Sequence, residues 1–326
     1  MKALVTGSSG FIGGHLAETL AGRGDDACCL VRKTSNIQWL EKINVRLVCG
    51  ECRDQESLHS TVRGVDYVFH LAAAIYAPNW ETYYQVNTLG TQNLIEACLA
   101  ANPTLKKFVF VSSISAAGPS PKGKSLREDD ECRPISDYGR SKWLAEQIVL
   151  KYGTRIPVTI LRPPNVIGPR QKELFESIKL IQKRILPLMG RFEPRTSLCS
   201  VADVVQAAIL LAEHKEADGK IYYVAESRPY SWAEVTDAIA EALGVDRFIL
   251  KVPYGIQYLA AGFAEVLSRL TGKTPLVNRG SVVAARKYDW VYDSSRIEKE
   301  LGFQARDTMP ETIRRTVDWY REQGLL

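Results

Sequence analysis

A glycine-rich turn between an apolar strand and a helix, close to the N-terminus, constrains the fold more than any other feature of the chain. KALVT is an apolar run of strand length, GSSG interrupts it, and the residues from Phe11 onward carry apolar side chains at helical spacing. Gly7 permits a tight turn, Gly10 lets backbone approach a pyrophosphate, and Gly13 lets the helix lie close to the sheet. The helix N-terminus adds amide groups and a positive dipole. We therefore expect a dinucleotide-binding site rather than a purely structural turn.

The second predicted strand ends in two basic residues. A carboxylate about 20 residues after the glycine turn would bind the 2′-hydroxyl of NAD, whereas an arginine there suits the 2′-phosphate of NADP. The strand expected at 27–31 ends in Arg32 and Lys33, with no carboxylate at that strand end. A bidentate Arg32 with Lys33 beside it favours the extra phosphate, so we predict NADP(H), with NAD(H) as the alternative. Both residues could also be ordinary solvated charges.

Three residues further along form a set suited to proton transfer. Ser113 follows the apolar run FVFV, which places its hydroxyl at the carboxyl end of a parallel strand. Tyr138 and Lys142 in YGRSK are four residues apart, so on a helix they share one face. Bringing a tyrosine pKa from about 10 towards 7 needs about 4 kcal/mol of preferential phenolate stabilisation. We expect Ser113 to bind the reacting oxygen, Tyr138 to exchange its proton, and Lys142 to hold the tyrosine pKa down and orient a ribose.

At this point the chain resembles the extended short-chain dehydrogenase/reductase family, also described as the NAD-dependent epimerase/dehydratase superfamily, over nearly its whole length. The matching motifs are TGSSGFIG (6–13), DYVFHLAA (66–73), VNTLGTQNLIEAC (86–98), VSSISAAG (111–118), YGRSK (138–142), LRPPNVIGP (161–169) and SVADVVQA (200–207). The resemblance implies that Ser113, Tyr138 and Lys142 are the catalytic residues. It also implies a homodimer that pairs through helices beside the active site, including the YGRSK helix.

The resemblance extends to the residues that contact the cofactor and the substrate. The cofactor positions that it implies, together with those expected from the residues themselves, are Gly7, Ser9, Gly10, Phe11, Ile12, Gly13, Arg32, Lys33, Glu51, Cys52, Leu71, Ala72, Ala73, Asn87, Val111, Tyr138, Lys142, Pro163, Asn165 and Val166. The expected substrate positions are Ile75, Tyr76, Ser113 and Asn165. One departure concerns adenine, because the family usually has Gly then Asp after the third strand and this chain has Gly50 then Glu51.

Composition and motif order predict an α/β enzyme with a Rossmann-type doubly wound parallel sheet and a smaller, discontinuous C-terminal lobe. At 326 residues, 45% of them hydrophobic, the chain can bury a large core and is long enough for about two domains. Strands and helices alternate up to about residue 161, and the pattern then changes. We expect a nucleotide domain at 1–164 plus about 198–226. A substrate lobe is expected at about 165–197 plus 227–326.

Several other functions are disfavoured by composition. The net charge of +5 comes from scattered basic residues, so nucleic-acid binding is not expected. No run reaches transmembrane length and the N-terminus enters directly into a strand, so we expect a cytoplasmic protein without integral membrane association. Seven cysteines include one CxxC, at Cys49 and Cys52, but neither a second pair nor suitably spaced histidines accompany it. We therefore expect no metal site.

Two reaction classes share the catalytic residues, and the lobe helps to choose between them. Relatives that act on nucleotide sugars usually carry an arginine seven residues before the aspartate matching Asp203, where this chain has Thr196 with Arg195 beside it. They also commonly have an RPGD-like stretch where this chain reads AARKYDWVYDSSR, in which Arg286 is an imperfect substitute. The apolar helix expected at 254–270, followed by TGKTP, instead looks like the lobe of 3β-hydroxysteroid dehydrogenase and dihydroflavonol reductase relatives.

The leading hypothesis is an NAD(P)(H)-dependent oxidoreductase that interconverts a secondary alcohol and a ketone on a small apolar or cyclic substrate, with Tyr138 as general acid/base. The alternative is a nucleotide-sugar epimerase or dehydratase with tightly bound NAD. A third possibility is a nucleotide-binding sensor without turnover, against which the intact catalytic residues argue. For the helix at 254–270 we expect core packing or substrate cover, with peripheral membrane contact as the other interpretation.

Overall fold

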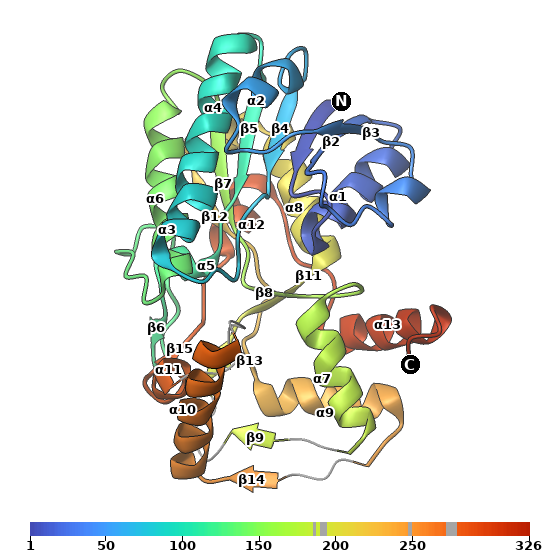
Figure 1. The fold of residues 1–326 in the computed structure, drawn as a ribbon, viewed down its shortest axis with the longest axis vertical. Helices are drawn as coiled ribbons and strands as arrows, with labels where there is room; N and C mark the ends of the chain where they lie inside the picture. The colour runs from blue at the N-terminus through green and yellow to red at the C-terminus, as the bar shows by residue number, and fades with distance from the viewer. Residues whose placement is uncertain (185–186, 190–193, 247–249, 272–278) are drawn as a thin grey trace.

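A seven-stranded parallel sheet forms the centre of the molecule (Figure 1). The computed structural model describes residues 1–184, 187–189, 194–246, 250–271 and 279–326. The strand order is β12-β7-β5-β4-β1-β2-β3, and every neighbouring pair is parallel. The strands are β1 (Lys2–Thr6), β2 (Asp26–Val31), β3 (Arg46–Cys49), β4 (Tyr67–His70), β5 (Lys107–Val111), β7 (Val158–Arg162) and β12 (Ile221–Tyr223). The doubly wound α/β fold predicted from the sequence is confirmed.

Helices cover both faces of this sheet and enclose two apolar cores. The helices on one face are α1 (Phe11–Gly22), α8 (Val201–Glu213) and α12 (Ser295–Leu301). Those on the other face are α2 (Gln55–Thr61), α4 (Gly90–Ala101) and α6 (Asp137–Tyr152). Successive side chains of β1 alternate between the cores, with Ala3 and Val5 in one and Leu4 in the other. Such burial on both faces explains why the strands read as continuous apolar runs.

The order in which the chain adds strands to the sheet reverses between β1 and β4. From β1 the chain builds outward through β2 and β3, and from β4 it builds the opposite way through β5, β7 and β12. Ligands of open α/β sheets bind outside the carboxyl ends of the strands at such a switch point. The shorter elements of this domain are η1 (Leu40–Lys42), α3 (Trp80–Tyr83), the π-helical turn η2 (Tyr84–Leu89), α5 (Ile114–Ala117) and η3 (Lys215–Ala217).

A smaller lobe lies beyond the carboxyl ends of the strands, at the bottom of Figure 1. Its own apolar core joins helices α7, α9 and α13 through residues such as Ile178, Ile239 and Ile313. The helices of this part are α7 (Lys172–Gln182), α9 (Trp232–Leu243), α10 (Tyr254–Thr271), α11 (Arg279–Lys287) and α13 (Met309–Glu322). The short strands pair as β8 (Asn165–Ile167) with β11 (Leu198–Ser200), β10 (Arg195–Thr196) with β13 (Tyr230–Ser231), β9 (Pro187–Met189) with β14 (Leu250–Val252), and β6 (Ser120–Pro121) with β15 (Tyr288–Asp289).

Helix α12 departs from the expected division of the chain. The stretch 227–326 was assigned to the substrate lobe, yet Ile297 and Leu301 pack into the same apolar core as α1 and α8. The cause is a short amphipathic helix with apolar residues four apart, which packs against the sheet before the chain adds α13 to the lobe. The chain therefore returns to the nucleotide domain before ending in α13.

Helix α10 is formed as predicted, but much of its apolar surface is not in a core. Ile256, Leu259, Phe263 and Val266 are all more than half exposed, whereas Ala261 is buried. Core packing is therefore the wrong expectation for this face, and substrate cover stays a prediction. The TGKTP segment that follows lies almost wholly outside the described residues. Among the residues described, no helix has the length and apolarity needed to cross a bilayer.

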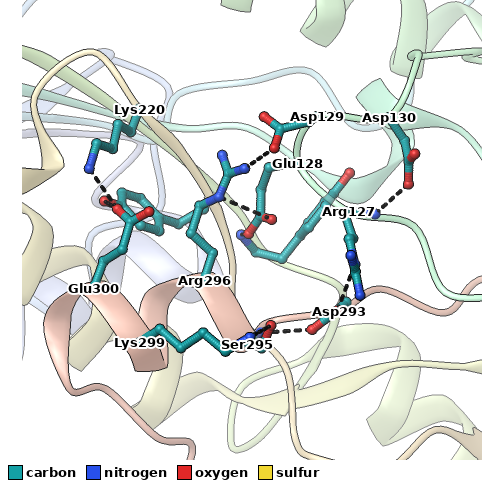
Figure 2. A network of polar contacts seen from close by, with 12 residues as sticks. Arg127, Glu128, Asp129, Asp130, Lys220, Asp293, Ser295, Arg296, Lys299 and Glu300 are labelled. Atoms are coloured by element: carbon teal, nitrogen blue, oxygen red, sulfur yellow. Dashed lines mark hydrogen bonds and ion pairs between the residues drawn. The ribbon is translucent and has the colours of Figure 1, made fainter.

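A network of charged side chains ties the segment between Ser113 and Tyr138 to α12 (Figure 2). Arg296 of α12 contacts Glu128 at 3.6 Å and also pairs with Asp129. Glu128 is 3% exposed and accepts a hydrogen bond of 3.0 Å from the backbone N–H of Tyr223 in β12. The carboxylate of Glu128 therefore serves a strand and a helix that are far apart in the sequence.

We predict that Glu128→Ala lowers the free energy of unfolding by about 1 to 3 kcal/mol, because the Tyr223 N–H and the Arg296 guanidinium lose a buried acceptor. Urea unfolding at neutral pH would measure the change. Asp129→Ala is the matched control, since that carboxylate is 82% exposed and should contribute less than about 1 kcal/mol. Equal losses in the two variants would contradict the role given to Glu128.

Candidate active site

Two positions in the glycine turn have no room for a side chain. Gly7 has a φ of 70°, and a Cβ there would lie 2.7 Å from the backbone of Leu71 and Ala72. A Cβ on Gly13 would overlap the carbonyl oxygen of Gly7. The Gly10 N–H donates to that oxygen at 2.9 Å, which closes the turn. Gly7 and Gly13 therefore have the packing roles expected of them, and the role of Gly10 beside a pyrophosphate stays a prediction.

The N-terminus of α1 is suited to an anion. Its N-cap is Gly10, so no side chain caps the first turn, and no acidic residue lies within that turn. Ser9 and Gly10 are exposed at this end, and Phe11 and Ile12 are partly buried. Free first-turn amides and the positive end of the helix dipole fit the pyrophosphate of a dinucleotide.

One threonine hydroxyl joins the ends of β1 and β4 at the switch point. Thr6 Oγ1 accepts from the N–H groups of Leu71 and Ala72, both at 3.2 Å, and donates to His70 Nδ1 at 2.7 Å. His70 Nε2 in turn donates to Thr91 Oγ1 at 2.9 Å, because that hydroxyl donates its own proton to the carbonyl of Asn87. Burial lowers the pKa of His70 to about 3, with the charge of nearby Lys142 acting in the same direction, so the imidazole is neutral.

Asn87 continues this chain of hydrogen bonds towards α6. It lies in the π-helical turn η2, and its side-chain amide makes two bonds to the backbone of Ala74, at 2.7 and 3.0 Å. Its Nδ2 also donates to Ser141 Oγ at 2.9 Å, and Ser141 Oγ donates to the carbonyl of Tyr138 at 2.7 Å. The backbone at Ala72–Ala74 and the start of α6 are thereby held at a fixed separation.

Ser113 and Tyr138 lie together at the carboxyl end of β5. Ser113 is the N-cap of α5, where its Oγ accepts from the Ser115 N–H at 3.1 Å. Tyr138 is in the first turn of α6, beside Ser113. Burial raises the pKa of Tyr138 to about 12, and the nearby Ser113 hydroxyl opposes that rise. Gly139 allows this contact, because a Cβ there would overlap the carbonyl of Ser115, a role that the YGRSK motif alone did not reveal.

Lys142 is buried beside them, one helical turn after Tyr138. Its side chain is 1% exposed, and Nζ donates to the carbonyl of Val111 at 2.8 Å. The same nitrogen lies 4.0 Å from the centre of the Phe110 ring. Burial lowers the pKa of Lys142 to about 7, while the charge of Glu146 raises it. An amine in this state can change its charge near neutral pH.

Aromatic side chains border Tyr138 on the side of α3. The Tyr83 ring lies 6.3 Å from the Tyr138 ring, and the Tyr83 hydroxyl donates to the carbonyl of Ile75 at 3.1 Å. Ile75 and Tyr76, the expected substrate residues, are both more than half exposed on the loop before α3. Trp80 stacks beneath the Arg140 guanidinium at 4.5 Å. The approach to Tyr138 is therefore largely apolar and aromatic.

Asn165 faces the lobe. It is exposed, and its Nδ2 donates to Thr196 Oγ1 at 2.9 Å, so the position where nucleotide-sugar enzymes usually have an arginine carries a hydroxyl instead. Its neighbour Val166 is 8% exposed and packs in the core with α1 and α8. Pro163 is buried, and its carbonyl accepts from the Ile114 N–H at 3.1 Å. Arg286 is the other candidate for binding a substrate diphosphate, and its side chain lies outside the described residues. Residues 190–193 of the expected substrate loop at 190–198 also lie outside them.

The residues expected at the adenosine end lie apart from the catalytic group, at the ends of β2 and β3. Arg32 and Lys33 are exposed and available to a ligand. Glu51 is ion-paired with Arg53, so its carboxylate is already occupied. Cys52 is buried, which raises its pKa to about 12, although the charge of Arg32 acts in the opposite direction.

The two CxxC cysteines, Cys49 and Cys52, differ in burial. All seven are free, and Cys52 packs in the core beneath α2 and α4 while Cys49 is exposed. Within the ranges that the structure describes, no group of three or more His, Cys, Asp or Glu side chains is arranged to hold a metal ion.

Known proteins from both reaction classes are similar to this chain. The model of the NAD dependent epimerase/dehydratase family matches residues 3–225. The decarboxylating sterol-4-alpha-carboxylate 3-dehydrogenase of Mus musculus is 29% identical, covering 97% of this chain and 90% of the mouse protein. UDP-glucose 4-epimerase of Vibrio cholerae is 27% identical, covering 96% and 93%. The structure of DesIV, the dTDP-glucose 4,6-dehydratase of Streptomyces venezuelae, with NAD and TYD bound, has a TM-score of 0.80 at 26% identity, covering 99% and 97%.

A doubly wound sheet with a glycine turn after β1, and with serine, tyrosine and lysine at β5 and α6, defines the extended short-chain dehydrogenases/reductases. The protein is thus an NAD(P)-dependent oxidoreductase. Within that class, the chain belongs to the NAD dependent epimerase/dehydratase family.

We predict that Gly13→Ala weakens nucleotide binding by more than about 100-fold, because the added Cβ overlaps the Gly7 carbonyl and must push α1 away from the turn. Isothermal titration with NADPH would measure the loss. Gly22→Ala on the same helix is the matched control, since no atom lies within 4 Å of a Cβ at that position. Unchanged affinity in Gly13→Ala would contradict the placement of the pyrophosphate.

Proposed function

We propose that the protein is an NADP(H)-preferring oxidoreductase that interconverts a secondary alcohol and a ketone on a small apolar or cyclic substrate. The observation that carries the reaction type is the contact between Ser113 and Tyr138 with Lys142 buried one turn away. Supporting the substrate class are the aromatic border of Tyr138 and the hydroxyl of Thr196 in place of an arginine.

In the proposed reaction, Tyr138 donates its proton to the carbonyl oxygen during reduction and removes it from the hydroxyl during oxidation. Ser113 donates a hydrogen bond to the same oxygen and orients it. Lys142 has two N–H donors beyond the one used by Val111, and these would bind the ribose of the cofactor. Its positive charge would also lower the pKa of Tyr138 from the high value that burial imposes. The bound nicotinamide supplies or accepts the hydride.

Cofactor preference is assigned from the end of β2. Arg32 and Lys33 are exposed, and the turn that follows is fixed by a 3.1 Å bond from the Arg32 N–H to Ser35 Oγ. A guanidinium on a fixed turn suits a 2′-phosphate. Gly7 to Gly13 would hold the pyrophosphate, and Asn87, Ala72 and Pro163 would lie along the rest of the cofactor.

The lobe formed by α7, α9, α10, α11 and α13 is proposed as the substrate-binding part. Residues of the loop before α3, with Asn165 from β8, would form the walls between it and the nucleotide domain. Dimerisation through helices beside the active site is the assembly that we propose, on the resemblance to the family.

A second candidate, a nucleotide-sugar epimerase or dehydratase, is favoured by the relatives in Vibrio cholerae and Streptomyces venezuelae. It would retain NAD tightly, because hydride is removed and returned within one cycle. Denaturing the purified protein and identifying the released nucleotide by mass spectrometry distinguishes the two. Stoichiometric NAD would favour the epimerase or dehydratase, and an exchangeable site that prefers NADPH would favour the reductase.

We predict that Tyr138→Phe reduces kcat for hydride transfer by at least about 100-fold, since the general acid/base is lost, while NADPH binding changes less than about threefold. Single-turnover absorbance at 340 nm and fluorescence titration would measure the two quantities. Tyr152→Phe is the matched control on the same helix, because that hydroxyl only pairs with Glu96 at the surface. Undiminished turnover in Tyr138→Phe would refute the mechanism.

We also predict that Arg32→Ala weakens NADPH binding by at least about tenfold and leaves NADH binding within about twofold, because only NADPH carries the 2′-phosphate. Parallel titrations of the nucleotide-free protein would show this. Arg46→Ala serves as the control, since Arg46 lies at the opposite end of the sheet, where β3 begins. Equal weakening of both nucleotides would remove the role given to Arg32.

A further inference from the structure

Directly behind Lys142, helix α6 buries a carboxylate. Glu146 is one turn after Lys142 on the same face, and its side chain is 0% exposed. Arg162, at the end of β7, is 1% exposed and binds Glu146 with both arms of its guanidinium, at 2.9 and 2.7 Å. This bidentate geometry is the strong form of an arginine–carboxylate contact.

Arg162 has further partners that fix its position. Its Nη1 donates to the Tyr223 hydroxyl at 3.0 Å, and Nη2 lies 3.2 Å from Cys132 Sγ. Tyr223 belongs to β12, and Cys132 to the loop that leads to α6. The guanidinium therefore joins two strands, a helix and a loop. Neither Glu146 nor Arg162 has a role in the proton transfer described above.

The groups around the Lys142 amine come from three elements. His70 of β4 is neutral, and β5 contributes the Phe110 ring and the carbonyl of Val111. Helix α6 itself contributes Tyr138 one turn before and Glu146 one turn after. Glu146 is the group whose charge favours the ammonium form against the effect of burial.

We propose that Glu146, held ionised by Arg162, is a positioning residue for Lys142 that favours the protonated form of the buried amine against the effect of burial. Arg162 is essential to this role, because a carboxylate buried without a partner would take up a proton and lose its charge. The inference rests on the function proposed for Lys142. It adds a residue pair to the site that the catalytic motif does not contain.

The direct test follows the charge of Lys142 in the nucleotide-free protein. NMR titration of its side-chain ¹⁵Nζ and ¹³Cε signals, assigned with Lys142→Arg, gives the midpoint of deprotonation, expected near pH 7 in the native chain. In Glu146→Gln the midpoint should fall by about one pH unit or more, since the neutral amide no longer favours the ammonium form. The pH profile of kcat/KM should change with it. An unchanged midpoint in folded Glu146→Gln would overturn the proposal.

A double variant separates charge from packing. Glu146→Met with Arg162→Met replaces the ion pair by apolar side chains, an exchange that buried pairs often tolerate. The fold should survive, but the Lys142 midpoint should stay as low as in Glu146→Gln. A native midpoint in the double variant would show that the pair acts only through packing, and would also overturn the proposal. This variant supplies the test if Glu146→Gln fails to fold.

Two controls keep the outcomes distinct. Glu128→Gln removes the carboxylate of another ion pair, four residues before Cys132 on the same loop, and should leave the Lys142 midpoint unchanged. Lys142→Met tests the proposed function itself, through hydride transfer. If Lys142→Met retains turnover while Glu146→Gln still shifts the titration, the proposed function fails and the role of Glu146 stands.

Discussion

The hydroxyl of Thr6 is the point on which the rest of the site depends. It joins β1 to the end of β4 at the switch point and starts a chain of hydrogen bonds through His70, Thr91, Asn87 and Ser141 to the backbone of Tyr138. Every bond in the chain has one donor and one acceptor only if the imidazole is neutral with its proton on Nε2. Burial keeps the imidazole neutral. The nucleotide turn and the start of α6 are thus held in one rigid frame.

Charge in this frame is confined to a few positions. The amine of Lys142 is buried one helical turn after Tyr138, and the Arg162–Glu146 ion pair is buried one turn further along α6. Because the interior has a low dielectric constant, each charge acts strongly on its neighbours and little on the surface. The Tyr83 ring lies 6.3 Å from the Tyr138 ring. The proton affinity of Tyr138 is raised mainly by burial, and Ser113 opposes that rise.

The sequence predicted the parts of the molecule that depend on local pattern. Strand and helix periods gave the doubly wound sheet, and the spacing of Tyr138 and Lys142 gave their shared face. Contacts between distant segments could not be predicted in this way. Gly139 is needed only because α5 packs against α6, and the return of α12 to the first core depends on a surface completed by other elements. Exposure of the α10 face was missed because an amphipathic pattern does not reveal what lies opposite it.

The charged network around Glu128 has a consequence for the architecture of the chain. The family model matches residues 3–225, which include nearly the whole sheet and the three proposed catalytic residues. The loop between Ser113 and Tyr138 nevertheless pairs with Arg296, which lies some 70 residues after the matched segment ends. The contacts of Glu128 and Asp129 therefore depend on a residue outside the segment that the family model matches. Helix α12 returns to the core against the sheet after α7, α9, α10 and α11, and α13 then returns to the core of the smaller lobe.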